Sequence, residues 1–192
     1  GVKTSRTLNP ERATVTARWE MAQPMPTYLF TFAAGVFVEI EDGWEDIGIH
    51  YYVEPEDMDA GVASFAHTPE VLRFFSNYTG FRYPFAKYDQ VVVRDFPFGG
   101  MENVTATTVT RNAIHAPGLQ EEMPSWGLVA HEAAHQWFGD VVTCQDWPHA
   151  WLNEGFATYF THLYRHHAFG EESFQYGMGG AVDAYTRACR GK

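Results

Sequence analysis

Two histidines and a glutamate stand inside an otherwise apolar segment, LVAHEAAHQWFGD, which runs from Leu128 to Asp140. A buried helix normally excludes such groups unless a partner compensates for their desolvation. His131 and His135 are four residues apart, so on a helix they lie one turn apart on the same face. Two neutral imidazoles at that separation can bind one zinc ion at about 2.0–2.1 Å, and Glu132 points toward the same site without being a ligand.

A third ligand for such an ion is present in the stretch WLNEGFATYF. Glu154 lies on the next predicted helix, and the 18 residues between it and His135 allow the first helix to end, turn and return antiparallel. Two histidines and one glutamate leave the fourth tetrahedral position to water, which is typical of a catalytic rather than a structural zinc site. We therefore expect one Zn²⁺ per chain, held by His131, His135 and Glu154. The alternative is that the three groups are buried in ordinary hydrogen bonds.

Three stretches together carry a resemblance to a known family: HEAAHQWFGD, WLNEGFA and, further upstream, FPFGGMEN from Phe96 to Asn103. They resemble the gluzincin metallopeptidases of the M1 aminopeptidase family, the aminopeptidase N-like enzymes, in which a GxMEN motif precedes HExxH. The similarity extends from about Pro24 to about Gly170. It implies a zinc aminopeptidase that releases N-terminal amino acids from peptides. It also implies an α+β fold, in which the end of an all-β domain precedes a thermolysin-like catalytic lobe with a small β-sheet and zinc-binding helices.

The GxMEN motif is predicted to bind the substrate. Two adjacent glycines beside a strand let another backbone approach closely, so an extended peptide can add hydrogen bonds to that edge. A glutamate held at a fixed distance from the zinc would bind the free ammonium group of a peptide N-terminus, whereas the alternative is a solvated strand residue. The predicted substrate-binding residues are Gly99, Gly100, Met101, Glu102 and Asn103.

Glu132 is the predicted catalytic base, which takes a proton from the attacking water and passes it to the leaving amine. In the family a tyrosine stabilises the transition state, and it belongs further downstream than this chain extends. A further family contact to the substrate ammonium comes from before Gly1. Two alternatives therefore stay open: a zinc-stabilised fragment that binds peptide N-termini with impaired catalysis, and the epoxide hydrolase activity that one branch of the family adds.

The composition excludes some partners. The formal net charge of −11 repels phosphate backbones, so we expect no nucleic-acid partner and instead expect peptides with a free N-terminus. No apolar run is long enough to span a bilayer, which predicts no transmembrane segment in this chain. The N-terminus lacks an initiator methionine, so we expect a chain cut from a longer one. The compartment stays open, as does whether Cys144 pairs with Cys189.

The elements that must position these residues follow from periodicity and from turn residues. Strands are predicted near Thr14 and over 28–40, 47–53, 88–94 and 101–110. Helices are predicted from Thr68 to just before Gly80, from Ser125 to Gly139, over 151–169 and at the C-terminus. We expect two parts, with residues 1–43 as the end of an N-terminal β domain and residues 44–192 as the N-terminal part of a zinc peptidase domain.

Overall fold

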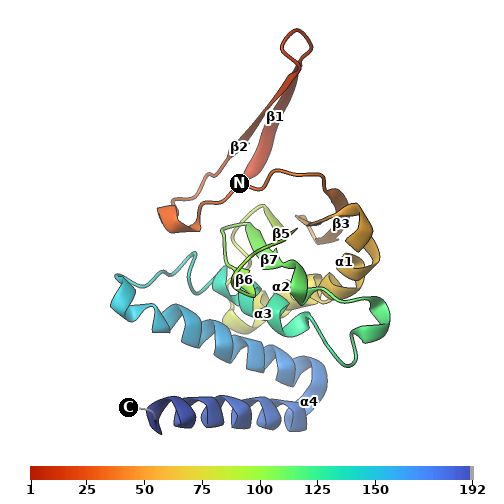
Figure 1. Cartoon of the computed structure of the whole chain (residues 1–192). Coiled ribbons are helices and arrows are strands. Elements are labelled where there is room, and N and C mark those ends of the chain that lie inside the picture. The colour runs from red at the N-terminus through yellow and green to blue at the C-terminus, as the bar shows by residue number, and fades with distance from the viewer. Residues whose placement is uncertain (191–192) are drawn as a thin grey trace.

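A computed structural model describes residues 1–190. It contains two β-sheets and a set of helices, and the helices lie on one side of the first β-hairpin of the chain (Figure 1). The first sheet is a two-stranded antiparallel hairpin of β1 (Val2–Asn9) and β2 (Thr14–Glu20). Almost every residue of this hairpin is exposed, and Figure 1 shows it projecting away from the rest of the molecule. The strand predicted near Thr14 is confirmed as β2.

The second sheet has five strands in the order β3-β4-β5-β7-β6. Its strands are β3 (Val38–Trp44), β4 (Ile47–Val53), β5 (Lys87–Val93), β6 (Gly100–Met101) and β7 (Ala106–Thr110). The pairs β4–β5 and β5–β7 are parallel, whereas β3–β4 and β6–β7 are antiparallel. Because β6 pairs with β7 alone, it forms an edge of this sheet, and it carries part of the GxMEN motif.

Four α-helices accompany this sheet within the described residues. They are α1 (Met58–Phe65), α2 (Thr68–Thr79), α3 (Trp126–His135) and α4 (Trp151–Arg190). Short 3-10 helices cover Thr27–Leu29, Pro55–Asp57, Arg111–Ala113, Pro117–Leu119 and Trp147–His149. The mixture of sheet and helices confirms the predicted α+β class.

The C-terminal end of α2 and the bend of α4 follow the local sequence signals, whereas α3 ends at His135, four residues before the predicted end at Gly139. Pro69 lies in the first turn of α2, and Gly80 ends this helix in the left-handed conformation with φ 67°. Helix α4 bends at Gly170, whose φ of 82° interrupts the helix, so its C-terminal half folds back along the first half (Figure 1). The helix predicted over 151–169 is therefore confirmed up to this bend.

The hydrophobic core joins the five-stranded sheet to the helices. Strand β4 alternates strictly between buried and partly exposed residues, which is the pattern of a strand with one face against the core. Helix α2 contributes Val71, Leu72 and Phe75, all fully buried, whereas Tyr78, which its spacing also predicts to point inward, is 56% exposed. Small residues dominate the buried face of α3, where Ala130, Ala133 and Ala134 allow close packing.

The strand predicted over 28–40 is wrong. Thr27–Leu29 forms a 3-10 turn, and β3 begins only at Val38 and continues to Trp44. The apolar run predicted a strand, but Pro26 opens a turn and no neighbouring strand pairs with residues 30–37. Phe30 and Phe32 consequently stay 70% and 83% exposed.

The strand predicted over 101–110 is also wrong, because it is two strands joined by a turn. Strand β6 ends at Met101 and β7 begins at Ala106, with Thr105 at a positive φ of 62° in between. The Ala106 amide donates to the Asn103 carbonyl at 3.0 Å and closes this turn. Glu102 and Asn103 therefore lie in the turn that follows the edge strand.

The domain division between residues 43 and 44 stays a prediction. The β3–β4 hairpin spans that position, and its two strands pair from Val38 with Val53 to Trp44 with Ile47. Cys144 and Cys189 are both free thiols. None of the helices between residues 1 and 190 is both long enough and apolar enough to cross a bilayer.

Candidate active site

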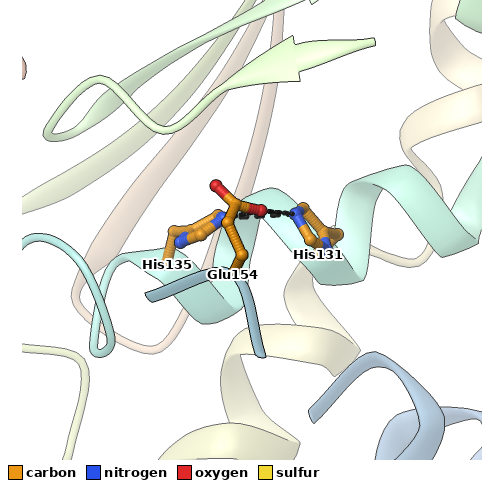
Figure 2. A group of neighbouring side chains, drawn as sticks. All are labelled: His131, His135 and Glu154. Atoms are coloured by element: carbon orange, nitrogen blue, oxygen red, sulfur yellow. Dashed lines mark hydrogen bonds and ion pairs between the residues drawn. The ribbon is translucent and has the colours of Figure 1, made fainter. Parts of the chain in front are cut away.

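His131, His135 and Glu154 form a compact cluster. Nε2 of His131 lies 3.1 Å from Nε2 of His135, and Oε2 of Glu154 lies 3.4 Å from the first and 3.7 Å from the second. Figure 2 shows the three side chains converging, the histidines from α3 and the glutamate from the first turn of α4. Four donors at about 2.0–2.1 Å around a tetrahedral ion are separated by about 3.3–3.4 Å. The spacing of the cluster is therefore close to what one zinc ion requires.

Packing between α3 and α4 creates this convergence. Ala133 of α3 and Ala157 of α4 are both completely buried, and their small side chains let the two helices approach. The start of α4 is fixed by Asn153, whose Oδ1 accepts a hydrogen bond of 3.1 Å from the Cys144 amide in the preceding loop. Glu154 is the next residue, so its backbone is held against α3.

His135 is oriented for metal binding by a backbone contact. Its Nδ1 lies 3.0 Å from the carbonyl oxygen of Phe138, which can only accept a hydrogen bond, so Nδ1 carries the proton. In the neutral ring Nε2 then presents its lone pair to the cluster. Burial acts to lower the pKa of His135, but the bond to Glu154 and the charge of Glu102 outweigh it and leave the pKa raised.

Glu154 is ionised at neutral pH. The neighbouring imidazoles of His131 and His135 hold the pKa of its carboxyl group far below the usual range. The side chain is 62% exposed, so the cluster is open to solvent on the α4 side. An anionic ligand beside two imidazoles is the donor set that a catalytic zinc site uses.

Glu132 lies on the same helix but is nearly buried, with 4% of its surface exposed. Burial raises the pKa of Glu132 to about 8; the charges of Glu102 and Glu154 add to this rise, while His135 opposes it. Its Oε2 has no hydrogen-bond partner among the described residues. A buried carboxyl oxygen without a donor is costly, so this group fits a site in which a cation or a water molecule completes its surroundings.

Gly100 explains how Glu132 is accommodated. A β-carbon at this position would overlap the carboxyl group of Glu132, and one at Gly99 would lie 3.2 Å from Cδ1 of Leu128. The sequence predicted close approach of another backbone at these glycines. The structure places the side chains of Glu132 and Leu128 against these glycines, and approach of a substrate backbone to the strand stays a prediction.

Glu102 is 8% exposed and has no hydrogen-bond donor to its carboxyl group between residues 1 and 190. Its charge raises the pKa values of Glu132 and Asp140, so it faces the same acidic region. The neighbouring Asn103 is fixed differently: its Nδ2 donates to the Leu29 carbonyl at 3.2 Å, and its Oδ1 accepts from Thr108 at 2.8 Å. Glu102 is thus available to a ligand, whereas the amide of Asn103 holds the turn. That Gly99, Gly100, Met101, Glu102 and Asn103 bind substrate stays a prediction.

Asp140 is a site feature that the motifs did not reveal. It is 5% exposed, and both of its carboxyl oxygens lack partners within the described chain. Burial, with the charges of Glu102 and Glu132, raises its pKa to about 9. Its amide donates to the His135 carbonyl at 3.0 Å, so it lies just beyond the end of α3. In the sequence Asp140 follows Gly139 at the predicted end of the helix, and this position did not indicate that its side chain is buried.

The fold and the cluster define a class. A small mixed sheet, a helix with two histidines one turn apart and a second helix with the third acidic group form the arrangement of a metallopeptidase lobe. Comparison with known families identifies it further: the Peptidase family M1 domain matches residues 63–188 of this chain. The chain therefore belongs to peptidase family M1.

Individual relatives agree with this assignment. The chain is 36% identical over 141 residues to "Probable aminopeptidase 2" of Sulfurisphaera tokodaii, covering 72% of this chain and 18% of that protein. It is 36% identical over 145 residues to "Aminopeptidase M1" of Arabidopsis thaliana, covering 72% and 16%. It is 34% identical over 154 residues to "Aminopeptidase N" of Canis lupus familiaris, covering 76% and 16%. The chain thus spans less than a fifth of the length of these relatives.

We predict that the protein binds about one zinc ion per chain. Replacing His135 with alanine removes one of three ligands and should lower zinc affinity by at least about a hundredfold, since even changes beyond the ligand shell cost 10–100-fold. His166→Ala, at an exposed histidine outside the cluster, is the control and should leave zinc binding unchanged. Elemental analysis and competition with a chelator measure both. Stoichiometric zinc of unchanged affinity in His135→Ala would show that the ligand assignment is wrong.

We also predict a pH dependence of stability for the metal-free protein. Because the folded pKa of Asp140, about 9, lies above its ordinary value of 3.8, the folded state holds a proton that the unfolded state loses. The free energy of unfolding should therefore fall as pH rises between these two values. In Asp140→Asn the fall between pH 6 and 8 should be smaller by about 3 kcal/mol, because one proton changes the free energy of unfolding by about 1.4 kcal/mol per pH unit. Urea unfolding of both proteins at pH 6 and at pH 8 tests this prediction. An equal fall in the free energy of unfolding in the wild type and in Asp140→Asn would contradict it.

Proposed function

We propose that this chain carries the active site of a zinc aminopeptidase that releases N-terminal amino acids from peptides. The observation that supports this proposal best is Glu102, a nearly buried carboxyl group without a donor in the described chain. A largely buried anion is costly unless a cation or hydrogen-bond donors compensate for its desolvation. A peptide supplies such a cation, its terminal ammonium group, directly beside its first peptide bond.

The edge strand β6 offers a binding surface for the rest of the substrate peptide. Because β6 pairs with β7 on one side only, its other side can accept an extended peptide through main-chain hydrogen bonds. Glu102 follows Met101, the last residue of β6, so an ammonium group bound there would lie at one end of such a peptide. Cleavage would then be limited to the peptide bond that follows the first residue of the substrate.

His131, His135 and Glu154 are the residues that would hold the zinc ion. When bound, the ion lowers the pKa of a water molecule toward neutrality and polarises the scissile carbonyl group. Glu132, whose carboxyl group lies beside the cluster with one oxygen unpaired within the described residues, would accept the proton of the attacking water. Glu132 would then donate this proton to the leaving amine nitrogen.

The division of the chain belongs to this proposal. Residues 1–43 would end an N-terminal β domain and residues 44–192 would begin the peptidase domain. The family match from residue 63 to 188 lies entirely in the second part.

We predict that Glu132→Gln retains zinc and loses peptidase activity. Glutamine preserves the shape of the side chain but cannot accept the proton, and loss of such a base typically costs about 10²–10⁴-fold in rate. Zinc content and turnover of an aminoacyl 4-nitroanilide measure the two effects. Unaltered turnover would exclude Glu132 as the proton carrier, and a wild-type protein that binds this substrate without cleaving it would instead be a binding module.

We predict that Glu102→Ala selectively impairs cleavage of peptides with a free N-terminus. Breaking a desolvated charge pair costs about 3–5 kcal/mol, so kcat/KM for such peptides should fall by at least about a hundredfold. Acetylated peptides lack the cation and should be poor substrates of the wild type, with little further loss in the variant. Glu102→Gln is the matched variant, which removes the charge and keeps the shape. A retained preference for the free amine in both variants would exclude Glu102 as the ammonium anchor.

A further inference from the structure

We propose that Gln136 is the positioning residue that sets the distance between Glu102 and the His131–His135 pair. This inference rests on the proposed function, in which Glu102 binds the substrate ammonium and the histidines bind zinc. Gln136 follows His135 directly and is completely buried. Its side chain reaches from the end of α3 to the turn that carries Glu102.

The side-chain amide of Gln136 binds both ends of the turn, Glu102 and Thr105. Nε2 of Gln136 donates to the backbone carbonyl of Glu102 at 3.1 Å. Oε1 of Gln136 accepts from the backbone amide of Thr105 at 3.0 Å and from the hydroxyl of Tyr83 at 3.3 Å. The Glu102 carbonyl is attached to the same Cα as its carboxyl-bearing side chain. The root of that side chain is therefore fixed by hydrogen bonds to the residue next to a zinc ligand.

The turn needs such anchoring because its conformation is strained. Thr105 has a φ of 62°, which a residue branched at Cβ rarely adopts. The Thr105 carbonyl accepts hydrogen bonds from the Asp89 amide at 3.0 Å and from Nζ of Lys87 at 2.9 Å. These contacts tie the far end of the turn to β5, and Gln136 ties it to α3. The position of Glu102 relative to α3 is set by Gln136.

A second buried glutamine, Gln90, provides a comparison, because among the described residues its side-chain amide has no hydrogen bond to the turn that carries Glu102. Gln90 is also completely buried, but its Oε1 accepts from Thr68 at 2.7 Å and its Nε2 has no partner in the described chain. The side-chain hydrogen bond that Gln90 makes within residues 1–190 goes to α2 and not to the turn that carries Glu102. In Gln136 both groups of the amide have a partner in the turn with Glu102: Nε2 donates to the Glu102 carbonyl and Oε1 accepts from the Thr105 amide. The Tyr83 hydroxyl, 3.3 Å from Oε1, has a single proton and also lies 2.9 Å from the Lys87 carbonyl, so it adds at most a shared hydrogen bond.

A fixed distance between Glu102 and the zinc ligands has a chemical consequence. It selects substrates in which the ammonium group and the scissile carbonyl are separated by a single carbon. In a β-aminoacyl substrate the ammonium group lies one carbon further away, so a rigid site discriminates against it. If Gln136 sets this distance, loosening its hydrogen bonds should reduce that discrimination.

The test uses the zinc-loaded protein at its natural length with L-alanine 4-nitroanilide and β-alanine 4-nitroanilide, which are constitutional isomers. We expect the wild type to favour the L-alanine isomer. In Gln136→Met, which keeps side-chain length and removes the hydrogen bonds, the ratio of the two kcat/KM values should fall about tenfold, since a misplacement near 1 Å can cost about a hundredfold. Most of the loss should occur with the L-alanine isomer, and zinc content should stay at the wild-type value.

Gln90→Met is the matched control and should leave the ratio unchanged. If Gln136→Met does not fold, Gln136→Asn takes its place, because its shorter amide cannot span to both Glu102 and Thr105; the ratio should again fall. An unchanged ratio in the folded variant, beside a wild type that prefers free over acetylated N-termini, would overturn the assignment of Gln136 alone. A wild type that cleaves acetylated peptides equally well would overturn the proposed function and this inference with it.

Discussion

The convergence of acidic groups that have too few donors is the constraint on which the site depends. Glu132 and Asp140 are nearly buried with unpaired carboxyl oxygens, and Glu102 is buried without a donor among residues 1–190. Each group raises the free energy of the folded chain unless it is protonated or paired with a cation. The raised pKa values of Glu132 and Asp140 show the first response. Zinc at the histidines and an ammonium group at Glu102 would pair with these carboxyl groups. The unfavourable free energy of the unpaired groups would then favour binding of both cations.

The rest of the fold brings these groups to one place. Alanine residues on α3 and α4 allow the close packing that presents Glu154 to the two histidines. At the edge strand, Gly100 leaves room for the Glu132 carboxyl group. The sheet contributes an edge, and the helix pair contributes the ligands, so neither layer forms the site alone.

Short-range spacing made the metal cluster predictable from the sequence, because residues four apart on a helix share a face whatever the rest of the chain does. The family resemblance drew attention to the motif around Glu102, whose substrate-binding role stays a prediction. The turn after Met101 was missed because Val, Thr and Ala favour a strand, whereas Thr105 takes a positive φ that only its tertiary hydrogen bonds support. The burial of Asp140 and the contacts of Gln136 depend on segments far apart in the chain, and neither leaves a local pattern.

The end of α3 thus serves as a common frame for two ligands. His135 faces His131 and Glu154 in the candidate metal cluster, and the next residue, Gln136, holds the turn that would bind the ammonium group. Hydrogen bonds from Asp89 and Lys87 hold the far end of the same turn to β5, so the separation between Glu102 and the histidines depends on how α3 packs against the sheet. Under the proposed function, this separation would decide whether the first peptide bond of a bound substrate lies at the metal. The separation therefore depends on two adjacent residues, His135 at the end of α3 and Gln136 directly after it, although the groups that would use it lie in different elements.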